Sequence, residues 1–320
     1  MLFAALISAC VIDLTEHDGT IWDADDAYAT DSGWSSWGYP DAPESVGSFT
    51  VRSLVWMNGE SVGVNADGEF GGVNLGSSVC HFESRSGVID SDIATSGATI
   101  DIGGLNDAGS VAVGQAGGEA WAVTNAGASS FEVGDVRDTA VEGDTVAILG
   151  GSRCAVHIAS IDGGVRDRIP QPEAACERGR LALVGGHAYT VDGTAILVDG
   201  LPTAVATAAL LFDVDVLSDT AFVVEGQVVR AARLSTGETL WTVDAGGTVR
   251  SIGVGGAPAY LHVLVDRGVR WFGAWDLDGV EVTGADLPGI DYGSGWPMAV
   301  ARDAGTVVVG TGEYTLVMNR

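Results

Sequence analysis

Lysine is absent from the sequence, so all 15 basic residues are arginines. They are outnumbered by 43 Asp and Glu residues, and the formal net charge at pH 7 is −28. A surface of this charge repels nucleic-acid backbones and anionic lipid headgroups, which excludes both as partners. Two interpretations of the charge remain: it keeps the protein soluble, for instance in salty surroundings, or it faces a cationic partner.

Two structural patterns are also missing. Outside the extreme N-terminus, no segment of about ten residues has helical periodicity of apolar residues. No later apolar run approaches the roughly 20 residues that a membrane-spanning helix needs. The chain is instead rich in Gly and Val, with recurring Asn-Gly and Asp-Gly turn signals, which favours many short strands joined tightly. One large all-β domain is therefore expected.

A short β-run of alternating small and branched residues recurs from about residue 48, at a spacing of about 35 to 49 residues. The runs lie at 61–64, 110–114, 145–150, 181–185, 220–224, 259–263 and 306–310. Further candidate strands accompany most of them, as at 228–234 and 238–243. Four antiparallel strands about every 40 residues are typical of a propeller blade.

We therefore expect an all-β fold, a seven-bladed β-propeller of four-stranded antiparallel blades over residues 48–320. Six or eight blades are the alternatives. The last repeat ends after what would be its third strand. A strand from residues 45–50 is expected to complete this blade, which closes the ring and covers its edges.

One repeat carries a family pattern. Residues 231–241 read Ala-Ala-Arg-Leu-Ser-Thr-Gly-Glu-Thr-Leu-Trp. This resembles the Ala-x-Asp-x-x-Thr-Gly-x-x-x-Trp repeat of quinoprotein-dehydrogenase-like (PQQ-like) propellers, with Arg233 in place of the Asp. In that family the Trp packs between blades and the Thr-Gly makes a turn, which implies these roles for Trp241 and Thr236-Gly237. A shorter echo lies at 274–279.

Enzymes of that family place two adjacent cysteines over their cofactor and hold calcium with a carboxylate and an Asn. Here Cys80, Cys154 and Cys176 are nowhere adjacent. The resemblance therefore implies the non-catalytic members, lipid-anchored propellers that scaffold assembly at the bacterial outer membrane, and no cofactor.

The N-terminus has the pattern of an exported, lipid-anchored protein. Residues 1–10 form an apolar run that ends at Cys10, and Ile7-Ser8-Ala9-Cys10 resembles the lipobox of bacterial lipoproteins, which implies a lipid on Cys10. A buried N-terminal strand or a disordered end is the alternative. Residues 11–47 carry many acids and no basic residue, which is typical of a flexible tether. We expect an extracytoplasmic monomer in the cell envelope that meets the membrane only through its lipid.

Three cysteines remain once Cys10 is set aside. In an oxidising compartment they leave one without a partner. Cys154 follows one candidate strand and Cys176 lies near the start of the next repeat, so a disulfide between adjacent blades is expected, with Cys80 free. Three buried thiols are the alternative.

No residues have the spacing of a metal site. The Asp-rich stretch 23–31 lacks the spacing of a calcium loop. The histidines are scattered and form no i, i+2 or i, i+4 pair, so we expect no metal. They are His17, His81, His157, His187 and His262.

Charged residues lie eight or nine positions before several β-runs. Arg52, Arg137 and Arg250 precede three runs at this distance, and Asp101, Glu173 and Asp213 fall near the same place before three others. If these positions begin the inner strands, the guanidinium groups ring the mouth of the central channel and bind a carboxylate or phosphate. Alternatively the two sets pair with one another as an inter-blade network.

The expected function is that of a non-enzymatic, surface-anchored scaffold for a protein or envelope partner. Two other classes stay open. One is a polysaccharide- or small-ligand-processing lyase or glycosidase, which needs two carboxylates converging in a pocket about 5 to 9.5 Å apart. The other is a structural or adhesion domain that binds calcium in its acidic turns.

Overall fold

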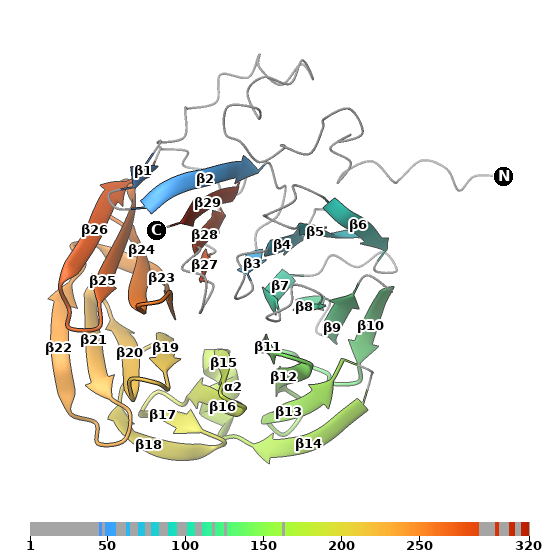
Figure 1. Cartoon of the computed structure of the whole chain (residues 1–320). Helices are drawn as coiled ribbons and strands as arrows, with labels where there is room; N and C mark the ends of the chain where they lie inside the picture. Colours follow the sequence, from blue (N-terminus) through green and yellow to red (C-terminus); the bar gives the residue numbers. More distant parts are fainter. Residues whose placement is uncertain are drawn as a thin grey trace, which may run out of the picture.

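The computed structural model describes residues 127–161 and 164–287, together with the backbone of the strands outside these ranges and a few of their side chains. The described strands form seven antiparallel sheets arranged in a ring (Figure 1). Each sheet is one blade of a β-propeller, and the predicted fold class is confirmed.

Six blades are built from four consecutive strands. Blade 1 is β3 (Val62–Val64), β4 (Phe70–Val73), β5 (Ser78–Phe82) and β6 (Ile89–Ala94). Blade 2 is β7 (Asp101–Leu105), β8 (Val111–Ala116), β9 (Glu119–Thr124) and β10 (Gly127–Phe131). Blade 3 is β11 (Asp138–Glu142), β12 (Thr145–Gly150), β13 (Ala155–Ser160) and β14 (Gly164–Pro170).

The next three blades follow the same order. Blade 4 is β15 (Leu181–Val184), β16 (His187–Val191), β17 (Ala195–Val198) and β18 (Leu201–Ala206). Blade 5 is β19 (Leu211–Asp215), β20 (Thr220–Glu225), β21 (Val228–Arg233) and β22 (Thr239–Asp244). Blade 6 is β23 (Thr248–Gly255), β24 (Tyr260–Asp266), β25 (Arg270–Asp276) and β26 (Glu281–Asp286).

The seventh blade joins the two ends of the chain. Its strands β27 (Met298–Val300), β28 (Val307–Gly310) and β29 (Thr315–Asn319) come from the C-terminal end. From the N-terminal end, β2 (Phe49–Val55) pairs antiparallel with β29, and β1 (Ser45–Val46) pairs with β2. The predicted closure by an N-terminal strand is confirmed, and the strand that performs it extends further than 45–50. The proposed leader 1–10 and most of the tether 11–47 lie outside the described residues.

Burial falls from the second strand of a blade to its outer strand. In β20 and β24 nearly every residue is buried, whereas β14 and β22 are mostly exposed. Alternate residues of one second strand pack into different cores, because each blade lies between two neighbours. In β12, Val146 and Ile148 pack toward blade 2 and Ala147 and Leu149 toward blade 4.

The seven β-runs found in the sequence are not all equivalent strands. Five are the second strands of their blades, but residues 61–64 and 181–185 correspond to β3 and β15, which are inner strands. The error arises because short apolar inner strands and second strands have the same pattern. As a result, when the repeats are aligned on their β-runs, the inner strands of blades 1 and 4 are aligned with the second strands of the other blades.

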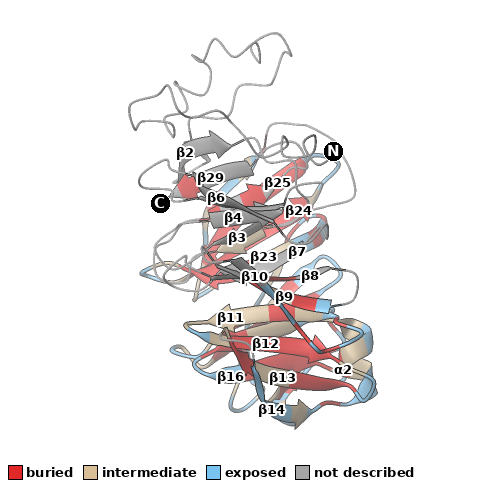
Figure 2. Cartoon of the chain, turned by 90° about the vertical axis from the view of Figure 1, so that its right-hand side faces the viewer, coloured by how far each residue is buried: buried red, intermediate tan, exposed pale blue. Residues whose placement is uncertain are grey.

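The ring has two faces. The inner strands contact one another around the centre (Figure 1). Because four antiparallel strands return the chain to the face from which it started, all inner strands start at one face. This face also carries the short helix α2 (Glu173–Arg178), between β14 and β15, and we call it the helix face (Figure 2). The opposite face carries the turns after the first and third strands of each blade, and we call it the turn face. Its described turns are 143–144, 185–186, 199–200, 216–219, 234–238, 256–259 and 277–280.

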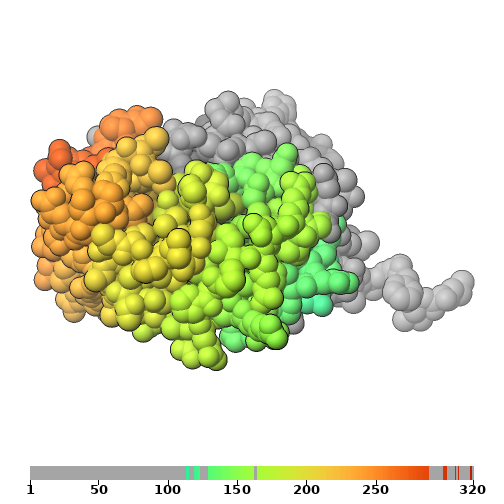
Figure 3. Space-filling view, turned by 90° about the horizontal axis from the view of Figure 1, so that it is seen from below, coloured from blue at the N-terminus to red at the C-terminus, as the bar shows by residue number. Residues whose placement is uncertain are grey.

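Successive blades adjoin along the rim of the ring (Figure 3). One contact there requires glycine. Gly237, in the turn before β22, has a φ of +75°, and a Cβ at this position would lie 2.2 Å from Ala204 O on the outer strand of blade 4. The Thr236-Gly237 turn predicted from the repeat pattern therefore also sets how closely blades 4 and 5 approach.

Candidate functional site

The three arginines predicted to ring the channel mouth do not occupy equivalent positions. Arg52 lies on β2, which is separated from the inner strand β27 by β29 and β28, so its predicted position at the mouth is wrong. The prediction assumed that residues 61–64 form a second strand, but they form the inner strand β3. Arg137 immediately precedes the inner strand β11, and Arg250 lies on the inner strand β23.

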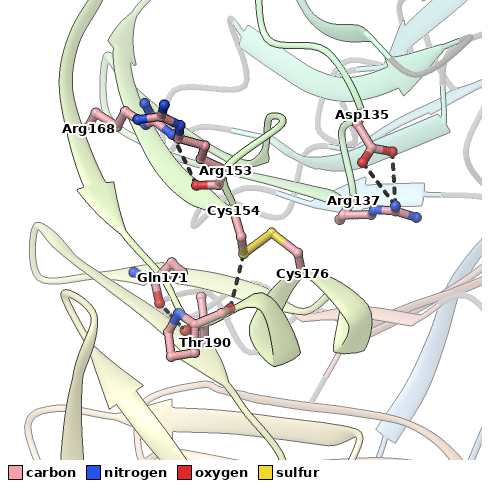
Figure 4. The surroundings of a disulfide bond; sticks show 9 residues. Asp135, Arg137, Arg153, Cys154, Arg168, Gln171, Cys176 and Thr190 are labelled. Atoms are coloured by element: carbon pink, nitrogen blue, oxygen red, sulfur yellow. Dashed lines mark hydrogen bonds and ion pairs between the residues drawn. A yellow bond between two sulfur atoms is a disulfide. The ribbon is translucent and has the colours of Figure 1, made fainter.

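Arg137 and Arg250 each pair with a nearby carboxylate. Arg137 Nη2 lies 2.9 Å from Asp135 Oδ1, in the loop before β11 (Figure 4). Arg250 Nη2 donates to Asp266 Oδ2 at 2.9 Å, across the first two strands of blade 6. Arg250 and its neighbours hold the pKa of the Asp266 carboxyl below its usual range, chiefly through this hydrogen bond. Anion binding by these arginines stays a prediction, and any anion must compete with the paired carboxylates.

The three predicted acids also differ in position. Asp101 is the first residue of the inner strand β7, and its side chain lies outside the described residues. Glu173 is the first residue of α2, so its predicted position at the entry of an inner strand, equivalent to that of Arg137, is wrong. The cause is again the alignment, because residues 181–185 are themselves the inner strand of blade 4. Asp213 lies on the inner strand β19 and is buried.

Carboxylates of the inner strands hold neighbouring blades together. Asp213 Oδ2 accepts a hydrogen bond from Val254 N on β23, at 2.8 Å. Asp138 Oδ2 in the same way accepts from Leu181 N on β15, at 2.8 Å. At the other end of β11, the Glu142 carboxylate accepts from the amides in the turn between β15 and β16, those of Gly185 and Gly186. These bonds join blade 3 to blade 4 and blade 5 to blade 6.

Asp138 was not singled out from the sequence. Burial raises the pKa of its carboxyl to about 6, although the nearby Arg180 and the amides of Leu181 and Thr139 favour the charged form. An Asp next to Arg137 is an ordinary sequence feature and does not indicate a contact between blades. Only the pairing of the inner strands shows that it lies between two blades.

Cys154 and Cys176 form a disulfide in the structure, the pair expected from the sequence. The bond joins the loop before β13 to α2, so it connects blade 3 to the segment that leads into blade 4 (Figure 4). Cys154 Sγ also lies 3.2 Å from Pro172 O. A disulfide sulfur has no proton to donate, so this approach is a packing contact. Cys80 lies on β5, and Cys10 lies outside the described residues.

Trp241 contacts the next blade, in the manner that the family resemblance implies. Its indole Nε1–H donates to Leu277 O of blade 6 at 2.7 Å. A Cβ on Gly279 would lie 2.8 Å from the Trp241 ring, so the ring packs directly on that turn. Trp241 therefore joins the outer strand of blade 5 to blade 6.

Replacing Trp241 with Phe is expected to destabilise the fold by about 1 kcal/mol, because the ring contact is kept while Leu277 O loses its donor. Urea unfolding followed by circular dichroism measures this. Trp241→Ala, which also removes the ring, should cost more. Equal stabilities of the wild type and Trp241→Phe would show that the hydrogen bond contributes nothing.

Charge is unevenly divided between the two faces of blades 3 to 6. Among the described residues of these blades, two arginines lie at or near the turn face: Arg233 at the end of β21, and Arg166 near the start of the outer strand β14. The turn-face carboxylates are Glu142, Asp144, Asp199, Asp215, Asp219, Glu238, Asp276, Asp278 and Glu281. The other arginines of these blades lie at or near the helix face, among carboxylates; they are Arg137, Arg153, Arg168, Arg178, Arg180, Arg230, Arg250, Arg267 and Arg270.

Several helix-face arginines bind backbone carbonyls of neighbouring loops. Arg230 Nη2 donates to Ala206 O at 2.6 Å, and Arg267 Nε donates to Ala245 O at 2.8 Å. The Arg267 guanidinium also lies 3.5 Å from the centre of the Trp271 ring. A planar guanidinium can bind a carbonyl and stack at once, which a lysine cannot. These arginines therefore stabilise loops between strands.

Histidines and carboxylates do not gather into a metal site. Among residues with described side chains, no group of three or more His, Cys, Asp or Glu residues is placed to hold an ion. His262 is fully buried on β24, where Nε2 contacts Gly255 O at 3.3 Å and the ring stacks on Phe272. Burial lowers the pKa of His262 to about 4, so its ring is neutral at pH 7. Within the described ranges, no helix is long and apolar enough to cross a membrane.

Comparison of the sequence with protein-family models and with curated proteins gives no match. Solved structures do match. A chain of the mitotic checkpoint complex has a TM-score of 0.64 at 14% identity, covering 88% of this chain and 98% of its own length. A Cps50 (Swd1) β-propeller domain from Myceliophteria thermophila has a TM-score of 0.63 at 10% identity, covering 85% of this chain and 99% of its own length. The chain is a β-propeller. At these identities the likeness establishes the fold alone, with structural neighbours of the WD40 type.

Proposed function

We propose that this propeller is a non-enzymatic scaffold that presents a rigid face to a protein partner. The observation that carries the proposal is the division of charge between two faces built on one rigid ring. Turns projecting from a rigid sheet scaffold are where proteins commonly place binding residues. One structural neighbour belongs to a multi-protein complex, the mitotic checkpoint complex, which supports a binding role for this fold.

We place the protein outside the cytoplasm, tethered to the bacterial outer membrane through lipid on Cys10. The disulfide between Cys154 and Cys176 supports an oxidising compartment, where such bonds persist. Relationship to the PQQ-like, lipid-anchored propellers is part of the same proposal. The packing of Trp241 on Gly279 supports it, because it reproduces the contact expected of that repeat.

Palmitate labelling of the full-length protein, followed by membrane fractionation and amine-to-carboxylate cross-linking, tests this function. The wild type should take up label, sediment with membranes and form a cross-linked species larger than itself. Cys10→Ala should lose the label and the sedimentation. An unlabelled wild type would refute the anchor, and a labelled protein that yields no adduct with another protein would refute the scaffold.

A further inference from the structure

The turn face combines exposed apolar side chains with its carboxylates. The three most exposed large apolar residues of the described chain all lie there: Leu217 is 99% exposed, Leu201 69% and Val280 61%. Each belongs to a different blade, blade 5, blade 4 and blade 6 respectively. The face is therefore apolar as well as acidic.

Carboxylates flank each of these apolar residues along the chain. Asp199 lies two positions before Leu201, Asp215 and Asp219 enclose Leu217, and Val280 is followed by Glu281. The same combination thus recurs in three consecutive blades. Single apolar residues scattered on a surface need no explanation. Here the three most exposed ones share one face and stand beside carboxylates, and apolar contacts surrounded by polar groups are typical of protein interfaces.

The turn that carries Leu217 is held in place by hydrogen bonds. Asp215 Oδ1 accepts from Leu217 N at 3.2 Å, and Ser218 Oγ donates to Asp215 Oδ2 at 2.6 Å. Asp219, with a φ of +53°, accepts from the amide and the hydroxyl of Ser235 in the next turn of the blade. A rigid turn loses little conformational entropy on binding, so Leu217 is presented in advance to a partner.

These hydrogen bonds give some of the carboxylates a structural role. Their donors are neutral amides and hydroxyls, so the face keeps its negative charge. In blades 4 to 6 as described, Arg233 is the only arginine of this face, and its Nε lies 3.8 Å from Glu238 Oε2. The face therefore attracts cations and repels nucleic acids and anionic membranes. Complementary charge steers association and selects partners.

We infer that the turn face of blades 4 to 6 is a docking surface for a basic protein partner, which receives Leu217 in an apolar contact surrounded by Arg or Lys side chains. This inference rests on the proposed scaffold function and names the surface and the chemistry of the partner. Fully burying one leucine side chain corresponds to about a 10- to 100-fold gain in affinity.

Isothermal titration of the full-length protein with two synthetic peptides tests the inference. One peptide alternates Arg and Leu, and the other alternates Arg and Ser at the same length and charge. The Arg-Leu peptide should bind at least about 10-fold more tightly. Added salt should weaken the binding of both, because both depend on the carboxylates.

Two variants then locate the binding surface. Leu217→Ser should weaken the Arg-Leu peptide about 10-fold and leave the Arg-Ser peptide unchanged. The matched control is Leu210→Ser, at the helix face, where Leu210 is 54% exposed; it should change neither affinity. Both substituted side chains are exposed, so unchanged melting temperatures confirm that both variants fold.

Two results would overturn this surface. One is a wild-type affinity for the Arg-Leu peptide that Leu217→Ser does not alter, and the other is a loss caused by Leu210→Ser instead. Either would leave the scaffold function standing, since a partner could still dock elsewhere. The absence of any cross-linked partner on membranes would refute the scaffold itself, whatever the peptides do.

Discussion

Deleting residues 1–55 is expected to abolish cooperative unfolding, whereas deleting residues 1–44 should preserve it. The longer deletion removes β2, which pairs along β29 from Thr50 with Asn319 to Val55 with Thr315. Without β2, β29 becomes an unpaired edge, and the ring loses the strand that joins its two ends. Because a domain is stable by only about 5–15 kcal/mol, losing this closure should remove most of its stability.

Thermal unfolding followed by circular dichroism, with size-exclusion chromatography, compares the two deletions. A synthetic peptide of residues 45–56 added to the longer deletion should restore part of the transition, and a scrambled peptide should not. If the protein lacking residues 1–55 unfolds at the same temperature as the full chain, the closing strand is not part of the fold.

His262 is expected to make the protein about 3 kcal/mol less stable at pH 4 than at pH 6.5. Burial lowers its pKa to about 4 in the folded state, from an ordinary value of 6.5. In this window the unfolded chain binds a proton that the folded protein does not, so stability falls as the pH falls. Each pKa unit corresponds to about 1.4 kcal/mol. The contribution is fully present above pH 6.5 and is lost toward pH 4.

Asp138 has the opposite effect on stability over an overlapping pH range. Its pKa is raised to about 6 from an ordinary value of 3.8, so the folded protein retains a proton that the unfolded chain releases. Its contribution is present below pH 3.8 and is lost as the pH rises through 6. The pH profile of the wild type alone therefore combines two opposing slopes.

Comparing variants separates the two groups. His262→Gln keeps an N–H that can reach Gly255 O, but it cannot be protonated, so its stability should decline less than that of the wild type between pH 6.5 and 4. Asp138→Asn removes a group that stabilises the fold as the pH falls, so the stability of this variant should decline more than that of the wild type over the same pH range. Urea unfolding at half-unit pH steps measures both. A difference between wild type and His262→Gln that is constant with pH would contradict the buried, neutral histidine.

The blade architecture could be predicted from the sequence because second strands are buried on both faces. Such strands are nearly continuous apolar runs, like 220–224 and 259–263, and they stand out in a Gly-rich chain. The closing strand could be inferred because the last repeat stops one strand short. Both features depend on local composition and chain order, which a sequence displays directly.

The site residues could not be placed so well, because their positions depend on which strand each run forms. Residues 181–185 are as apolar as a second strand, yet they line the centre of the ring. Because of this ambiguity, Glu173 of α2 was predicted at the entry of an inner strand. The same ambiguity at 61–64 led to the predicted position of Arg52 at the channel mouth, although Arg52 lies on β2. Likewise, Asp-Gly pairs such as Asp199-Gly200 indicate turns, but only the strand order shows that these turns share one face.

The most direct test of the proposed docking surface is site-specific photo-cross-linking in the cells that produce the protein. A photoreactive phenylalanine analogue is placed at position 217 of the full-length chain and, in a second protein, at position 210. Position 217 should yield a discrete adduct with one basic protein, reduced when Asp278 and Glu281 are replaced with Asn and Gln, and position 210 should yield none. An adduct at position 210 alone, or at neither position, would contradict a partner that docks on the turn face.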